Sequence, residues 1–205
     1  MTDLFKEKAK DWDVNDTIKQ LSSGVGESLL KNIDLNHDMQ VMDFGAGTGL
    51  ITSQIARHVK QVTAVDVSPA MLEQLADKLS TFDNINILCQ NILKEPLNIQ
   101  FDLIVSAMAI HHIENTDNLL KQFSLLLKPG AKIALADLDK EDGSFHPADI
   151  QGVYHNGFER DDFKRLLEQN NFTDIKITTA HKVSKNGTIY PVFLATATRN
   201  STTIN

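Results

Sequence analysis

Short apolar runs alternate with amphipathic stretches through the middle of the chain. The runs are rich in Val, Ile, Leu and Phe and end at glycine, aspartate or serine, as buried strands do. They predict strands at residues 41–44, 61–65, 85–89, 101–106 and 131–136, and helices between them at residues 50–59, 68–79 and 116–127. Strands and helices that alternate at this length indicate an α/β fold, a doubly wound parallel sheet with helices on both faces.

The pattern changes after the fifth predicted strand. The remaining chain predicts an irregular acidic segment, one helix and two strands, at residues 137–158, 160–170, 174–179 and 188–198. Only residues 180–187 separate the last two strands, which is too short for a crossover helix. We therefore expect these two strands to pair antiparallel.

The first 38 residues are mostly polar but carry an apolar stripe, formed by Ile18, Leu21, Val25 and Leu29. Steps of three and four residues predict an amphipathic helix. Gly24 and Gly26 are expected to weaken or split it. Its stripe either packs against the core or forms a lid over a pocket, and the sequence leaves both interpretations open.

Composition limits the possible functions. The 205 residues carry 20 Lys and Arg against 27 Asp and Glu, a net charge of −7, and no basic run, so nucleic-acid binding is not expected. Cys89 is the single cysteine, which excludes an internal disulfide and fits the cytoplasm. No apolar run reaches the roughly 18 residues of a membrane span, and the charged start is unlike a signal peptide. We expect one domain over 1–205, with a helical cap at 1–38, a core at 40–198 and a tail at 199–205.

A glycine-rich turn follows the first predicted strand and opens the next helix. It reads G-x-G-x-G and not the G-x-G-x-x-G of dinucleotide binders, because Leu50 stands where the third glycine would be. Asp43, just before the glycines, would repel a pyrophosphate and suits a cationic ligand. Asp66 ends the second strand, where a carboxylate is placed to accept hydrogen bonds from a ribose diol. The ligand is thus expected to have a ribose and a positive charge.

Four segments together resemble class I S-adenosylmethionine (SAM)-dependent methyltransferases in order and spacing. They are VMDFGAGTGL at 41–50, TAVDVS at 63–68, FDLIVSAMAIHHI at 101–113 and LLLKPGAKIALAD at 125–137. The resemblance covers residues 40–136. It implies a Rossmann-like sheet of seven strands, mostly parallel with an antiparallel final strand, SAM as cofactor and S-adenosyl-L-homocysteine as product.

The same resemblance implies roles for individual residues. Asp43 would orient the region near the methionine ammonium, and Gly45, Ala46 and Gly47 would face the methionine and ribose. Asp66 would bind the ribose diol. The adenine would lie near Val67, Met71, Asn91 and Ile92, with Asn91 standing where the family often has an acidic residue. Ser106 would lie near the methyl donor. Val67 and Met71 suit a helix-facing core equally well, and Asn91 suits a turn.

Methyl transfer is an in-line displacement that depends first on alignment, so a catalytic base is optional. The candidate bases are His111, after the fourth strand, and Tyr154 and His155 in the irregular segment. Each has a structural alternative, in packing, in capping a turn or on a solvated loop. His111 and His112 are adjacent and would point apart on a strand, so no metal site is expected.

The sequence therefore predicts methyl transfer to an unidentified small-molecule acceptor. Three alternatives stay open: a SAM-binding regulatory module without catalysis, a nicotinamide-dependent oxidoreductase on the same sheet, and another reaction of the same cofactor. Asp43, Leu50 and the antiparallel end of the sheet argue against the nicotinamide reading.

Overall fold

A computed structural model describes residues 3–147 and 149–201, and part of the predicted tail lies outside this range. Its helices are η1 (Ala9–Val14), α1 (Asp16–Asn32), α2 (Thr52–Ile55), η2 (Ala56–His58), α3 (Pro69–Lys78), η3 (Ile110–His112), α4 (Thr116–Leu126) and α5 (Arg160–Gln169). Its strands are β1 (Gln40–Phe44), β2 (Gln61–Asp66), β3 (Ile85–Cys89), β4 (Phe101–Ala107), β5 (Leu127–Leu138), β6 (Phe172–Lys185) and β7 (Thr188–Arg199).

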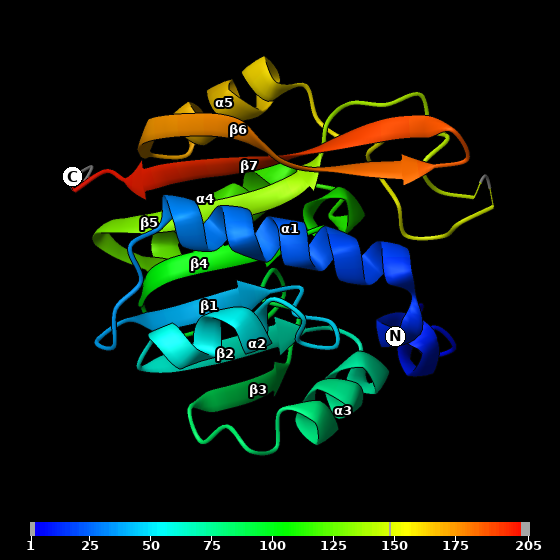
Figure 1. Cartoon of the computed structure of the whole chain (residues 1–205). Coiled ribbons are helices and arrows are strands. Elements are labelled where there is room, and N and C mark those ends of the chain that lie inside the picture. Colours follow the sequence, from blue (N-terminus) through cyan, green and yellow to red (C-terminus); the bar gives the residue numbers. More distant parts are fainter. Residues whose placement is uncertain (1–2, 148, 202–205) are drawn as a thin grey trace.

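Within the described residues, seven strands form one sheet in the order β3-β2-β1-β4-β5-β7-β6. The first five strands are parallel to their neighbours, whereas β7 is antiparallel to both β5 and β6. The predicted fold class is confirmed, including the antiparallel end. The carboxyl ends of the parallel strands meet at one edge of the sheet, on the right of Figure 1.

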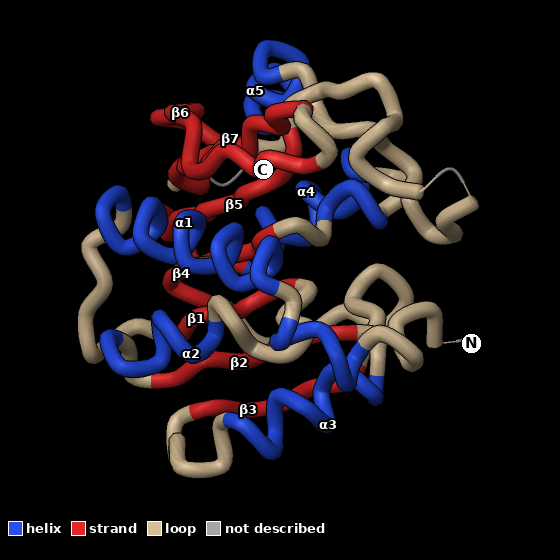
Figure 2. Tube along the Cα trace, turned by 45° about the vertical axis from the view of Figure 1, so that its right-hand side comes forward, coloured by secondary structure: helices blue, strands red, loops and turns tan. Residues whose placement is uncertain are grey.

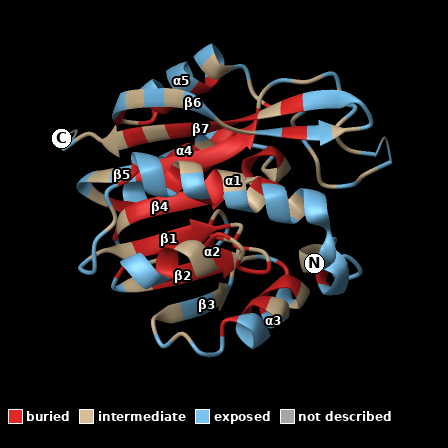
Figure 3. Cartoon of the chain, viewed as in Figure 1, coloured by how far each residue is buried: buried red, intermediate tan, exposed pale blue. Residues whose placement is uncertain are grey.

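Helices cover both faces of the sheet (Figures 1 and 2). One face packs against α1 and α2 through Val25, Leu29 and Ile55, and the opposite face packs against α4 and α5 through Phe123 and Phe163. The buried residues form a continuous band along the central strands (Figure 3). This rigid centre holds the loops at the sheet edge in place.

Helix α1 is continuous through Gly24 and Gly26, contrary to the expected break. A Cβ atom on Gly24 would lie 2.3 Å from Nδ1 of His181, and one on Gly26 would lie 1.9 Å from Oε1 of Gln54. The glycines therefore let α1 approach β6 and α2 closely, and the packing gained outweighs the weak helix propensity.

Three other boundaries differ from the sequence prediction. The segment after the glycines forms a short α2 and η2 in place of one helix, and β5 runs through Pro129 and Gly130 to Leu138. Strand β6 extends to Lys185 because Asn186 and Gly187 adopt φ of 52° and 80°. Such a two-residue turn with both φ positive joins antiparallel strands directly.

We expect Leu29→Ala to lower the free energy of unfolding by about 2–4 kcal/mol, because the Leu29 side chain is buried under α1 and its loss leaves a cavity. The matched control is Leu30→Ala on the exposed side of the same helix, with an expected loss below about 1 kcal/mol. Urea-induced unfolding of both variants measures the difference. Equal losses would show that α1 does not contribute to the core.

Candidate active site

The turn after β1 is fastened to β2 by its own backbone. The amides of Gly45 and Ala46 donate to the Val65 carbonyl at 2.8 and 3.1 Å. Gly45 and Gly47 have φ of 70° and 54°, which favours glycine. A Cβ atom on Gly45 would lie 2.3 Å from Cβ of Ala109, whereas one on Gly47 would meet nothing within 4 Å. Gly45 thus permits close contact with the loop after β4, and Gly47 borders open space.

Asp66 links the glycine turn to the start of α3. Its carboxylate accepts hydrogen bonds from the amide of Gly47 at 2.8 Å and from the amide of Ser68 at 2.9 Å. Ser68 caps α3 through its hydroxyl, which accepts a hydrogen bond from the Met71 amide at 3.2 Å. Burial raises the pKa of Asp66 above its ordinary value. Each carboxylate oxygen keeps acceptor capacity for a further donor, so Asp66 is equipped to bind hydroxyl groups.

Asp43 is buried beneath the glycine turn. The Thr52 hydroxyl donates to its carboxylate at 2.6 Å. Burial raises the pKa of Asp43 to about 7, and the nearby Asp66 adds to the effect. A positively charged ligand group close to Asp43 would favour its ionised form.

A cavity of about 850 Å³ opens at the carboxyl ends of the parallel strands. This volume suits a small molecule or a cofactor. The predicted cofactor residues that line it are Asp43, Gly45, Ala46, Gly47, Asp66, Val67, Met71, Asn91 and Ile92. Ser106 does not line it, because it is buried in β4 and its hydroxyl donates to the Phe44 carbonyl at 2.9 Å.

The N-terminal segment forms one wall of this cavity. Phe5 and Trp12 line it together with Ile18, Leu21 and Val25 of the apolar stripe of α1. Asp13 fastens the segment to the sheet edge, because its carboxylate accepts hydrogen bonds from the Thr48 hydroxyl and the Lys78 ammonium, each at 2.5 Å. The stripe therefore packs on the core and also borders the cavity, so the two readings of this helix are compatible.

His111 lies at the other end of the cavity, in η3 after β4. Its Nδ1 is 2.7 Å from Oδ1 of Asp137, which is fully buried in β5. Oδ2 of Asp137 accepts hydrogen bonds from the amides of Ile110 and His111, at 2.9 and 3.1 Å. Burial alone would raise the pKa of Asp137, but the His111 side chain and the amides of Leu138 and His111 outweigh it and lower that pKa. An ionised Asp137 accepts a hydrogen bond from Nδ1–H of His111, so in the neutral form of this ring Nε2 is the free acceptor.

His111 and His112 do not point apart, because η3 is a tight turn and not a strand. Their ring centroids are 4.1 Å apart, and His146 lies 5.1 Å from His111 and 6.1 Å from His112. We call these three residues the imidazole cluster. Burial lowers the pKa of both His112 and His146 to about 4, so both rings are neutral near pH 7. Within residues 3–147 and 149–201, no group of His, Cys, Asp or Glu is arranged to hold a metal ion.

The other two candidate bases differ in position. Tyr154 is 56% exposed and lies at the cavity rim. His155 does not line the cavity: its Nε2 lies 2.9 Å from the Ile113 carbonyl oxygen and 3.2 Å from the Thr116 hydroxyl. These contacts tie the loop after β5 to the turn after β4. We therefore regard His155 as a positioning residue.

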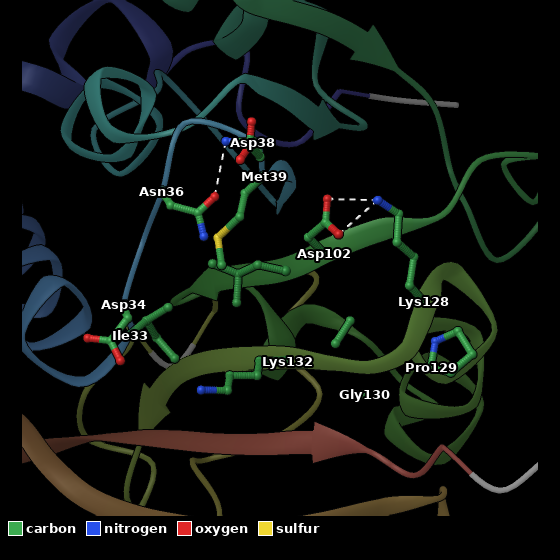
Figure 4. Close-up of a pocket in the computed structure, with 12 residues that line it drawn as sticks. Ile33, Asp34, Asn36, Asp38, Met39, Asp102, Lys128, Pro129, Gly130 and Lys132 are labelled. Atoms are coloured by element: carbon green, nitrogen blue, oxygen red, sulfur yellow. Dashed lines mark hydrogen bonds and ion pairs between the residues drawn. The ribbon is translucent and has the colours of Figure 1, made fainter.

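A second cavity, of about 470 Å³, lies at the opposite edge of the sheet (Figure 4). Its main charged groups pair with each other: the Lys128 ammonium donates to both carboxylate oxygens of Asp102 at 2.8 and 2.9 Å. Asp102 also accepts from the Gln40 amide at 2.9 Å. Asp102 and Lys128 are thus satisfied by structural contacts, and Asp34, Asp38 and Lys132 complete the charged lining of this cavity.

The sequence does not predict Asp137 as the partner of His111, and it offers His146 only as one of several polar residues in the irregular segment 137–158, with no role of its own. Asp137 had been assigned to the irregular loop, but β5 continues through it. The signal was present, because β4 and β5 are adjacent parallel strands with Ala107 opposite Ala136, so the residues that follow both meet at the same edge. For His146 no local pattern exists, since a long loop brings it back to the cluster.

Comparisons with known proteins agree with this geometry. A family profile described as a methyltransferase domain matches residues 42–133. An uncharacterized methyltransferase of Schizosaccharomyces pombe is 34% identical over 138 residues, which cover 58% of this chain and 48% of that protein. The chain thus spans about half the length of the yeast relative. An uncharacterized methyltransferase of Geobacillus kaustophilus is 29% identical over 193 residues, 90% of this chain and 87% of that protein.

Among solved structures, the N-methyltransferase NodS from Bradyrhizobium japonicum in complex with S-adenosyl-L-homocysteine has a TM-score of 0.71. It is 16% identical, and the match covers 97% of this chain and 99% of NodS. The residues of this chain suit the same nucleoside, because Gly47 borders open space and Asp66 has acceptor capacity facing the cavity. On the motifs, the sheet order and these relatives together, the chain belongs to the class I SAM-dependent methyltransferases, and SAM is its cofactor.

Proposed function

We propose that the chain transfers the methyl group of SAM to a small-molecule acceptor, and that His111 removes a proton from that acceptor. One observation carries the proposal: a single cavity is lined by the glycine turn and Asp66 at one end and by His111, held by Asp137, at the other. A cofactor subsite and a base thus share one space. Because the chain belongs to the class I SAM-dependent methyltransferases, a nicotinamide-dependent oxidoreductase is no longer an alternative.

The order of the strands supports a direction for the cofactor. Asp66 ends β2 and Asn91 follows β3, whereas the glycine turn follows β1 and His111 follows β4. With the ribose on Asp66 and the adenine between Val67 and Asn91, the methionine part lies along the glycine turn. The donor methyl would then face the ends of β4 and β5, where the imidazole cluster lies.

SAM supplies an activated methyl group, and the protein residues align, desolvate and deprotonate the acceptor. Nε2 of His111 takes the acceptor proton, and the ionised Asp137 stabilises the resulting imidazolium through Nδ1. The apolar walls from Phe5, Trp12 and Phe145 exclude water. Alignment of this kind contributes roughly 7–11 kcal/mol to such reactions.

The acceptor is proposed to be small because the N-terminal segment closes one side of the cavity, which leaves about 850 Å³ for cofactor and acceptor together. The net charge of −7 argues against a nucleic-acid acceptor. No helix in the described part of the chain is long and apolar enough to cross a membrane. We keep the cytoplasm as the proposed location on the basis of the single, unpaired Cys89.

We expect Asp66→Ala to weaken SAM binding tenfold or more, because a hydrogen bond to a charged group contributes roughly 1.5–3 kcal/mol. Isothermal titration calorimetry with SAM and S-adenosyl-L-homocysteine measures the change. Asp77→Ala, at an exposed position of α3, is the control and should bind like the wild type. Unchanged affinity in a folded Asp66→Ala variant would contradict the ribose assignment.

We also expect SAM affinity to rise between about pH 6 and pH 8. The free protein holds a proton on Asp43, whose pKa is about 7, and the cationic cofactor favours the carboxylate, so binding releases this proton. In the free protein, the raised pKa makes the free energy of unfolding fall as the pH rises from about 4 to about 7. SAM has titratable groups of its own, so the pH dependence of its affinity must be compared with that of a variant without the Asp43 proton. Asp43→Asn serves this purpose because its side chain keeps an acceptor for Thr52. A parallel pH dependence in variant and wild type would refute the linkage.

Asp13→Asn tests the N-terminal wall as a lid. The substitution weakens the contacts with Thr48 and Lys78, so we expect SAM to dissociate several-fold faster. Stopped-flow displacement of bound SAM measures the rate. Asp11→Asn, at an exposed position of η1, should leave the rate unchanged. An unchanged rate in both variants would indicate that the wall only packs on the core.

A further inference from the structure

The imidazole cluster contains buried nitrogen atoms without a hydrogen-bond partner. Among the described residues, Nε2 of His111 and Nε2 of His146 are both buried and unpaired. A buried polar atom left unpaired costs about 1–3 kcal/mol, so two such atoms beside one cavity need an explanation. A ligand with two hydrogen-bonding groups would satisfy both.

The hydrogen-bond partners of the rings restrict what such a ligand can offer. Nε2 of His111 is an acceptor because Nδ1 faces Asp137, so the ligand must donate to it. His112 has its Nδ1 2.6 Å from the Gly152 carbonyl oxygen, so its Nε2 is also an acceptor. His146 is neutral in either tautomer. A hydroxyl group both donates and accepts and therefore matches His146 in both cases, whereas an ammonium only donates.

The charges around the imidazole cluster disfavour a cationic acceptor. Lys185 lines the cavity and donates to the Phe145 carbonyl. After burial, His111 and His112, its charge adds to the lowering of the pKa of His146. Asp137 is the carboxylate in contact with the cluster, but it lies buried behind His111. An ammonium would therefore add a positive charge beside Lys185 and the sulfonium of SAM.

The walls around the imidazole cluster are aromatic. The Phe5 ring lies edge-on to His112 with centroids 5.3 Å apart, and the Phe145 ring lies edge-on to His146 at 4.9 Å. Trp12 and Tyr154 also line the cavity. Flat apolar walls of this kind favour a ring over a flexible polar chain.

We propose that the acceptor is an uncharged aromatic compound with two neighbouring hydroxyl groups, one bound to Nε2 of His111 and methylated, the other bound to Nε2 of His146. The proposal rests on the proposed function and adds the substrate class and His146 as the residue that selects it. In the reaction, the first hydroxyl proton moves to Nε2 of His111 and its oxygen forms a bond to the methyl carbon. The carbon–sulfur bond breaks, and its electron pair stays on sulfur, which becomes a neutral thioether.

The test compares three probes of similar size: 1,2-dihydroxybenzene, phenol and benzylamine. Reaction is measured by release of S-adenosyl-L-homocysteine, and binding is measured by calorimetry of the protein saturated with S-adenosyl-L-homocysteine. We expect the dihydroxy compound to bind and to react at least tenfold better than phenol in kcat/KM, and benzylamine not to react. Equal binding of the dihydroxy compound and phenol, or reaction with benzylamine, would overturn the proposal. If the wild-type protein did not bind SAM, the proposed function would fail together with the substrate class. If it bound SAM but did not discriminate between the probes, only the substrate class would fail.

Two variants assign the hydroxyl groups to individual rings. His146→Phe keeps an aromatic ring without nitrogen, so KM for the dihydroxy compound should rise about tenfold while the values for phenol stay within twofold. His111→Asn keeps a donor for Asp137 but lacks Nε2, so kcat should fall at least 100-fold for both hydroxyl compounds. His37→Phe, in an exposed loop, is the control. Equal effects of His146→Phe on both compounds would remove His146 from acceptor selection.

Discussion

A single buried carboxylate organises the reactive end of this protein. Asp137, at the end of β5, accepts hydrogen bonds from the amides of Ile110, His111 and Leu138 and from the His111 ring. These contacts hold the chain after β4 in a tight turn and place His111 in the wall of the cavity. A buried charge is stable only when it is fully hydrogen-bonded, so the turn and the charge depend on each other. The loop after β5 is attached to the same turn by separate hydrogen bonds, from the amides of Tyr154 and His155 to the His111 carbonyl.

The cofactor end follows the same principle with a different carboxylate. Asp66 holds the glycine turn and the start of α3 through backbone amides, so the subsite is formed by main chain that the sheet keeps rigid. Asp43 has fewer hydrogen-bond donors around its carboxylate, and burial raises its pKa to about 7. It therefore holds a proton that the approach of a cationic ligand would release. The two ends meet in one cavity because β1 and β4 are neighbours in the sheet. Donor and acceptor groups are thereby aligned by elements that do not need to move.

The strands and the glycine turn were predictable because their signals are local. A run of apolar residues before three alternating glycines predicts β1 and its turn, and Ser68 before Pro69 predicts the start of α3. Other positions depended on packing. Gly24 and Gly26 weaken an isolated helix, yet in the protein they allow α1 to contact His181 and Gln54. Ser106 stands in a motif position, but its hydroxyl is used within the sheet by the Phe44 carbonyl.

The sequence by itself determined the α/β class and the antiparallel end of the sheet, and its motifs indicated the cofactor. They also predicted the residues proposed to bind it, all of which line the cavity except Ser106. Only the tertiary structure decided which histidines share a site. His111 and Asp137 are 26 residues apart and meet because β4 and β5 are adjacent in register. His146 reaches the same cavity through a loop without regular spacing, and tertiary contacts alone settle its position. The residues at the acceptor end of the cavity are therefore brought together by long-range packing, whereas most of those at the cofactor end belong to local sequence motifs.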